Sequence, residues 1–222
     1  MADEYAKAGF YVYIPDFLKG KRLPKVKLIN QPGDSFPLSY LKDLCPTKGQ
    51  MEQHTPEEIG AKKGAAYGVF GPWVGNHSVT DAFPIIQNFV RHLRADPSHK
   101  KIGAVGMCWG GWSAIKLVQK GIDPFVDASV ACHPGFLVIP DDAEKVERPL
   151  NIHVGSLDDY LPLSEASKIA EVFKDKPDCS IDVYEDQVHG FASRGDLSVE
   201  KDRKAKEEVA EKVQAFFFGC SS

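Results

Sequence analysis

The sequence predicts an α/β fold in which a mostly parallel β-sheet is flanked by helices. Short apolar runs rich in Val and Ile alternate with longer amphipathic stretches, and in the second half of the chain the order is strand, helix, strand, helix. Hydrophobic residues make up 43% of the 222 residues and charged residues 26%, which is typical of a globular protein that buries a sizeable core. We therefore expect a single α/β domain over residues 1–222.

Strands and helices are expected at defined places along the chain. The expected strands cover residues 10–14, 102–107, 125–131, 150–154 and 180–184. The expected helices cover residues 81–94, 112–120, 142–146 and 162–173, followed by a C-terminal helix. In that last helix Ala205, Val209 and Val213 recur at helical spacing and charged residues cover the other side, which predicts a solvated outer face.

Residues 15–75 differ from the rest of the chain. They contain many prolines and glycines, which predicts an irregular insert of loops broken by short helices. A long irregular insert often covers a functional site.

Charge and composition exclude several classes of protein. There are 27 Lys and Arg against 31 Asp and Glu, so the net charge of −4 offers no basic excess for nucleic acid. No apolar run approaches the length of a membrane span, and the N-terminus lacks the pattern of a signal peptide. The five cysteines are odd in number and contain no C-x-x-C pair, which indicates reduced thiols. We expect a cytoplasmic protein that binds neither nucleic acid nor membrane.

The most informative motif is Gly106-Met-Cys108-Trp109-Gly110, which follows an apolar strand and opens a helix. This is the pattern of a nucleophile elbow with cysteine in the nucleophile position. Glycine two residues before and two after Cys108 relieves the crowding of such a tight turn. Cys108 would lie at the start of the helix, where free N–H groups favour negative charge, and the N–H of Trp109 would face an oxyanion.

Two further residues complete a catalytic constellation. Asp158 follows the strand at 150–154 and His189 follows the strand at 180–184, which is the order that this arrangement requires. His189 would take the proton of Cys108, and Asp158 would orient the imidazole, with Asp159 as the alternative acid. Each residue also has a plainer interpretation, as a turn cap or a solvated loop residue, but the three together in order favour a triad.

Other candidate residues are weaker. Cys132-His133 follows a strand, but no further ligand lies at the spacing of a zinc site, so a packing role is favoured over a second nucleophile or a metal ligand. A set of aromatic residues is compatible with an apolar pocket or with the core: Tyr67, Trp73, Trp112, Tyr160 and Phe191.

These motifs resemble the dienelactone hydrolase (carboxymethylenebutenolidase-like) family of the α/β-hydrolase fold. The resemblance runs along nearly the whole chain, and it is carried by Gly-Phe-Tyr-Val-Tyr-Ile-Pro-Asp-Phe at 9–17, the elbow, Cys-His-Pro-Gly at 132–135, Gly-Ser-Leu-Asp-Asp-Tyr-Leu-Pro at 155–162 and Val-His-Gly-Phe-Ala-Ser-Arg-Gly at 188–195. It implies a Cys-Asp-His hydrolase that cleaves lactones or small esters through a thioester, without metal or organic cofactor, as a monomer or homodimer. It also implies that Arg194 binds a substrate carboxylate, although the family's bacterial lactonases carry this arginine one position earlier. Phe191, from the aromatic set above, is a further candidate for contact with the substrate.

The chain departs from the family at its front. The family begins with additional strands and a loop that supplies a second oxyanion donor and an acidic residue near the thiol, and we expect these first strands to be missing here. Loss of one oxyanion donor lowers the rate by a factor on the order of 100 to 1000. A catalytically silent binding or scaffold protein is therefore the alternative. A glutamine-amidotransferase-like protein is disfavoured because Phe191 stands where His-x-Glu requires Glu, and a serine hydrolase because Ser113 falls inside a helix.

Overall fold

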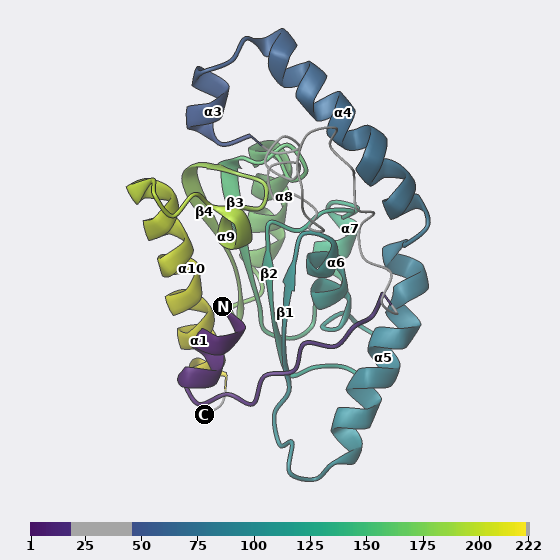
Figure 1. Cartoon of the computed structure of the whole chain (residues 1–222). Coiled ribbons are helices and arrows are strands. Elements are labelled where there is room, and N and C mark those ends of the chain that lie inside the picture. Colours follow the sequence, from purple (N-terminus) through teal and green to yellow (C-terminus); the bar gives the residue numbers. More distant parts are fainter. Residues whose placement is uncertain (19–45, 221–222) are drawn as a thin grey trace.

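A computed structural model describes residues 1–18 and 46–220 and contains a central parallel sheet, shown in Figure 1. The described strands lie side by side in their sequence order, and every neighbouring pair is parallel. They are β1 (Gly103–Met107), β2 (Ala128–Cys132), β3 (Leu150–Leu157) and β4 (Cys179–Val188). The predicted mostly parallel α/β sheet flanked by helices is confirmed.

The strand ends differ from the sequence-based bounds for physical reasons. β2 begins at Ala128 instead of residue 125, since the ring of Phe125 is 37% exposed and lies against the guanidinium groups of Arg94 and Arg148. β4 continues four residues beyond the predicted end, to Val188. This extension carries the chain directly to His189.

The predicted strand at residues 10–14 was wrong. The segment is extended but pairs with none of the described strands, and Tyr11 and Ile14 are 92% and 80% exposed. Instead, the ring of Phe10 packs on Phe218 at 4.8 Å between centroids, and Tyr13 contacts Phe89. An apolar run becomes a strand only where a neighbouring strand accepts its backbone hydrogen bonds, and here the rings of Phe10 and Tyr13 contact helices instead.

Helices cover both faces of the sheet, so the body has three layers. Along β2, Ala131 faces one apolar cluster while Val130 and Cys132 face the other, as the alternation of side chains on a strand requires. The first face is covered by α5 (Val79–Ala95), α6 (Trp109–Lys116) and α8 (Leu163–Phe173), and the second by α1 (Ala2–Lys7) and α10 (Glu200–Gly219). Two short helices, α7 (Asp141–Glu144) and α9 (Phe191–Arg194), follow β2 and β4.

The prediction of an irregular insert over 15–75 was wrong for its last part. After the short α3 (Lys48–Glu52), residues 56–75 form one helix, α4 (Pro56–Gly75). The Thr55 side chain accepts the Glu58 N–H at 3.3 Å, and Glu58 accepts the Thr55 N–H at 2.8 Å, so a capping box starts the helix. Its glycines face open space and are tolerated at some cost in stability. Residues 19–45, with Cys45, lie outside the described residues.

Figure 1 shows α4 outside the three layers, at the end of the sheet where the strands finish. Among the described helices, none combines the length and apolar character needed to cross a membrane.

Candidate functional site

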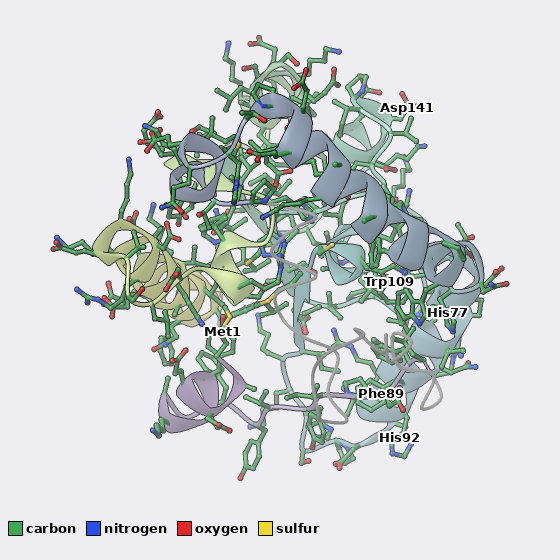
Figure 2. The ribbon with its side chains drawn as sticks, turned by 45° about the horizontal axis from the view of Figure 1, so that its top comes forward. Met1, His77, Phe89, His92, Trp109 and Asp141 are labelled. Atoms are coloured by element: carbon green, nitrogen blue, oxygen red, sulfur yellow. The ribbon has the colours of Figure 1, made fainter. Side chains whose placement is uncertain are left out.

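Four polar or nucleophilic side chains stand at the same edge of the sheet. Cys108, His133, Asp158 and His189 each directly follow the last residue of β1, β2, β3 and β4. Because the strands are parallel, their carboxyl ends meet at one edge, and this is the usual position of ligand sites in open α/β sheets. Figure 2 views the molecule from this edge, with α4 crossing in front of it.

The turn at Cys108 is strained and is held by its backbone. Cys108 has φ 51° and ψ −111°, a conformation that a residue with a side chain rarely adopts. Its N–H donates to the carbonyl oxygen of Cys132 at 3.1 Å, and its carbonyl oxygen accepts from Gly111 at 3.0 Å and Gly135 at 3.2 Å. These bonds project the half-buried thiol from the turn, as expected for an elbow.

Only one of the two glycines flanking Cys108 is sterically required. A Cβ at Gly106 would lie 2.1 Å from the carbonyl oxygen of Gly110, so this position tolerates no side chain. At Gly110 itself a Cβ would meet nothing within 4 Å, whereas at Gly111 it would lie 2.8 Å from Pro134 Cβ. The expectation of crowding is confirmed for Gly106 and wrong for Gly110, because the helix packs on Pro134 through its next residue.

The structure brings Cys108, His189 and Asp158 together. His189 Nε2 lies 3.0 Å from Cys108 Sγ, and its Nδ1 lies 3.0 Å from each Asp158 carboxylate oxygen. Asp158 and His189 are buried. The alternative acid Asp159 is exposed instead, and its carboxylate pairs with Lys63 Nζ at 2.5 Å. Of the two candidate acids, Asp158 is the one that contacts the imidazole.

The surroundings of His189 favour a protonated imidazole. Burial opposes the charge, but the hydrogen bonds and negative charges of Asp158 and Cys108 outweigh it and raise the pKa of His189 to about 9. Asp158 Oδ1 is held in turn by the N–H groups of Tyr160 at 2.8 Å and Leu161 at 3.2 Å. The carboxylate is therefore fixed to its own loop as well as to the histidine.

Cys132 and His133 belong to the interior. Burial raises the pKa of Cys132 to about 12, so this thiol is no second nucleophile. His133 is fully buried with its ring 5.1 Å from that of His189, and burial, together with the charges of His189 and Arg194, holds its pKa well below the usual value. Neither of its ring nitrogens has a hydrogen-bond partner in the described part of the chain. No group of three or more metal-ligating side chains occurs among the described residues.

Trp109 is fixed at the start of α6. As the first residue of the helix, it has an N–H without a partner within the helix, which suits an oxyanion donor. Its indole Nε1 donates to the carbonyl oxygen of His77 at 2.9 Å, and Figure 2 shows the two residues side by side near the end of α4. The Trp73 ring stacks on His77 at 4.6 Å between centroids, so this corner is aromatic.

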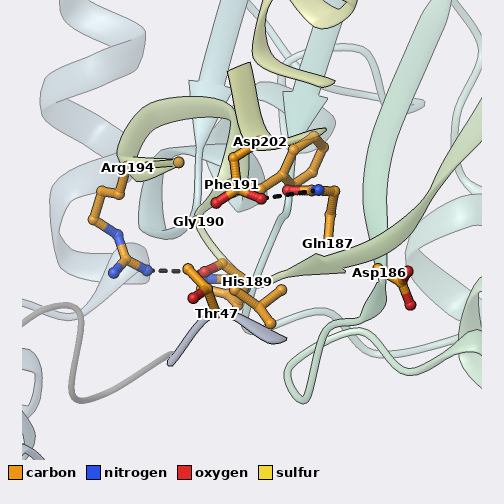
Figure 3. A pocket seen from close by; sticks show the side chains of 10 residues that line it. Thr47, Asp186, Gln187, His189, Gly190, Phe191, Arg194 and Asp202 are labelled. Carbon is orange, nitrogen blue, oxygen red and sulfur yellow. Dashed lines mark hydrogen bonds between the residues drawn. The ribbon is translucent and has the colours of Figure 1, made fainter. Parts of the chain in front are cut away.

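Phe191 and Arg194 line the pocket drawn in Figure 3, together with His189. Phe191 is 2% exposed and packs on Tyr184 and His133, so its ring belongs to the core, and its role as a substrate contact stays a prediction. Arg194 Nη2 donates to the carbonyl oxygen of His189 at 2.9 Å, and the guanidinium passes so close to Gly190 that a Cβ there would lie 2.1 Å away. The pocket in Figure 3 includes both residues and His189, while Cys108 is not among the described residues that line it.

Sequence reasoning missed how α4 contributes to this site. Lys63 pairs with Asp159, and the hydroxyl of Tyr67 lies 2.5 Å from that of Tyr160. Each pair joins residues more than ninety positions apart. Tyr67 and Tyr160 were candidates as aromatic residues, but no local pattern marks Lys63.

Comparison with known proteins points to one family. The model of the dienelactone hydrolase family matches residues 1–220. Hydrolase pyvD of Aspergillus violaceofuscus is 30% identical over 210 residues, which cover 94% of this chain and 69% of that protein. The carboxymethylenebutenolidase of Pseudomonas putida is 31% identical over 105 residues, 46% of this chain and 43% of that protein. A solved Pyrococcus furiosus esterase has a TM-score of 0.49 and 19% identity, covering 63% of this chain and 62% of that structure.

Proposed function

This chain belongs to the dienelactone hydrolase family, and we propose that it cleaves a lactone or a small carboxylic ester with Cys108 as nucleophile. The observation that carries the proposal is the imidazole of His189, which lies 3.0 Å from the Cys108 thiol on one side and 3.0 Å from the Asp158 carboxylate on the other. Such a nucleophile, base and orienting acid within hydrogen-bond reach is the arrangement that acyl transfer requires. Relatives that are named hydrolases agree with this reaction class.

In the proposed first half of the reaction, Cys108 is acylated. The protonated imidazole of His189 already holds the thiol proton on Nε2, and Cys108 Sγ attacks the carbonyl carbon of the substrate as a thiolate, whereupon the carbonyl oxygen becomes an oxyanion facing the Trp109 N–H. When the oxyanion collapses, the bond to the ester oxygen breaks, and His189 returns its proton to that oxygen. The products of this half are a thioester on Cys108 and a hydroxyl group, which in a lactone stays on the same molecule.

In the second half, water releases the acyl group. His189 takes a proton from a water molecule, whose oxygen attacks the thioester carbonyl, and the tetrahedral intermediate expels Cys108 Sγ. The thiolate stays paired with the protonated His189, as at the start of the cycle, and a carboxylic acid leaves. Asp158 stays ionised throughout and stabilises the imidazolium in both halves. Arg194, whose Nη2 donates to the carbonyl oxygen of His189, is proposed to bind a substrate carboxylate.

The first test measures the reactivity of Cys108 directly. Limiting iodoacetamide is added to the purified chain between pH 5 and 9, and the modified cysteines are identified by intact mass and peptide mapping. We expect Cys108 to be alkylated faster than Cys220. We expect His189→Ala to lower the alkylation rate of Cys108 by a factor on the order of 100. His92→Ala, which changes an exposed histidine outside the site, is the matched control and leaves the rate unchanged.

Turnover completes the test. With p-nitrophenyl acetate and an enol lactone as substrates, Cys108→Ala is expected to abolish hydrolysis. Unchanged turnover in Cys108→Ala contradicts the proposal. If Cys108 also reacts no faster than Cys220, the elbow is not activated, and a catalytically silent binding protein becomes the better interpretation.

A further inference from the structure

Tyr160 touches the Asp158–His189 pair in two ways. Its backbone N–H donates to Asp158 Oδ1 at 2.8 Å, the same oxygen that contacts His189 Nδ1 at 3.0 Å. Its ring lies against the imidazole of His189, with 4.4 Å between centroids and a tilt of 43°. One residue therefore contacts the carboxylate through its backbone and the imidazole through its side chain.

Tyr160 is itself tied to α4. Its hydroxyl lies 2.5 Å from the hydroxyl of Tyr67, and the neighbouring Asp159 pairs with Lys63 one helical turn earlier on α4. The two contacts join α4 to the loop after β3. The position of the Tyr160 ring thus depends on a helix that lies outside the three layers.

The Tyr160 ring restrains a rotation that the other contacts leave open. The bonds from Nε2 to Cys108 and from Nδ1 to Asp158 define a line through the imidazole, but they resist tilting about that line only weakly. Rings that pack against the imidazole restrain the tilt, and among the described residues the rings of His133 and Tyr160 contact it. His133 is locked in the core, whereas Tyr160 is half-buried and held through its hydroxyl.

We propose that Tyr160 is a positioning residue for His189, and that Tyr67 on α4 holds it in place through the bond between their hydroxyls. This inference rests on the proposed function. Tyr160 acts through the imidazole and not on the substrate carbonyl, so its loss lowers kcat without a matching change in KM. In the part of the chain that the structure describes, the titratable and charged groups that face His189 are Cys108, Asp158, His133, Arg194 and Tyr160 itself, and the variants below leave the first four in place.

The experiment compares Tyr67→Phe, Tyr160→Phe, the double variant and Tyr160→Leu with the original chain. Because each Phe variant removes the same hydrogen bond, we expect each to lower kcat by roughly 3-fold to 10-fold and the double variant to fall no further. Tyr160→Leu also removes the aromatic ring, so we expect a larger decrease in kcat. The pH profile of Cys108 alkylation in this variant should also move toward that of His189→Ala. Tyr13→Phe is the matched control, since it removes a hydroxyl bonded to His99 away from the site.

The outcomes separate this inference from the proposed function. If Cys108 alkylation depends on His189 but Tyr160→Leu keeps the original kcat and pH profile, the positioning role is overturned while the function stands. If the losses of the two Phe variants multiply in the double variant, the hydroxyls act independently and the role of Tyr67 is overturned. If His189→Ala leaves Cys108 alkylation unchanged in the original chain, the proposed function fails, and the inference fails with it.

Discussion

The imidazole of His189 experiences opposing effects within a few ångströms. Burial disfavours its charged form, while hydrogen bonds and charges from Asp158 and Cys108 favour it and prevail, with a pKa of about 9 in the folded protein. The usual value is about 6.5 in an unfolded chain. Because the folded pKa lies above the unfolded one, the contribution of His189 to stability is fully present below pH 6.5 and is lost as the pH rises through about 9.

Replacement of Asp158 by Asn removes one of the two groups that raise the pKa of His189. We expect Asp158→Asn to lower the pKa of His189, since the carboxylate charge disappears while the burial remains. The pKa is measured by NMR titration of the imidazole Cε1–H signals. Asp159→Asn is the control, because Asp159 is exposed and pairs with Lys63. A pKa near 9 in Asp158→Asn would show that the carboxylate is not what charges the histidine.

At the scale of elements, the nucleophile turn depends on how closely β1 and α6 approach each other. At Gly106 in β1, the space that a Cβ would need is taken by the carbonyl oxygen of Gly110 in α6. This close approach of strand and helix lets the helix start directly after Cys108. A glycine motif in the sequence does not say which of its glycines is crowded. That depends on the angle at which α6 leaves the strand and packs on Pro134.

Two alanine substitutions test this difference. We expect Gly106→Ala to lower the free energy of unfolding by about 1 to 3 kcal/mol, because backbone must move to admit the methyl group. Gly110→Ala meets no atom within 4 Å and removes a glycine from a helix, so we expect stability to stay the same or rise by up to about 1 kcal/mol. Urea unfolding measures both variants. Equal losses in the two would contradict the one-sided crowding.

In α4, a local pattern that correctly indicates the start of a helix competes with a glycine-rich composition that predicts loops. Thr55, Pro56 and Glu58 form a capping box with proline in the first turn, a recognisable start of a helix. The glycines that follow predict loops, and the sequence alone offers no means to weigh the two signals. In the structure, Lys63 and Tyr67 on this helix bind the loop after β3, which supplies contacts that local propensity does not include.

At the scale of the whole molecule, one sheet joins two apolar clusters. Val209 and Val213 of α10 are fully buried on one face with Tyr184 and Val130, while α5, α6 and α8 pack on the other. The side chains of each strand alternate between these clusters. Loss of packing on one face is therefore expected to weaken the other.

Val209→Ala tests this coupling across the sheet. We expect it to lower the free energy of unfolding by about 1 to 3 kcal/mol, since two buried carbons are lost from a site with no exposure. The urea midpoint should fall equally by far-UV circular dichroism and by tryptophan fluorescence, whose sources are Trp73 in α4 and Trp109 and Trp112 in α6, the helix that packs on the opposite face through Ile115. The control Val199→Ala, at a side chain 46% exposed, changes stability by less than about 0.5 kcal/mol. A shift in only one signal would mean that the two faces unfold separately.

The sequence by itself determined the α/β class and the candidate triad. Local sequence patterns predict apolar strands, amphipathic helices and the residues that directly follow a strand. Parallel strands bring the residues that follow them to one edge of the sheet, whatever the details of packing. In this way the sequence predicts Cys108, Asp158 and His189 as the candidate triad, with the neighbouring Asp159 as the alternative acid.

Only the tertiary structure decided the rest. It shows Asp158 against His189, pairs Asp159 with Lys63, buries Phe191, leaves residues 10–14 unpaired with any of the described strands and places Tyr67 beside Tyr160. Each of these depends on which segments, up to more than ninety residues apart, pack against each other. Local propensity carries no information about such contacts, because they arise from the burial and hydrogen bonding of the whole chain at once.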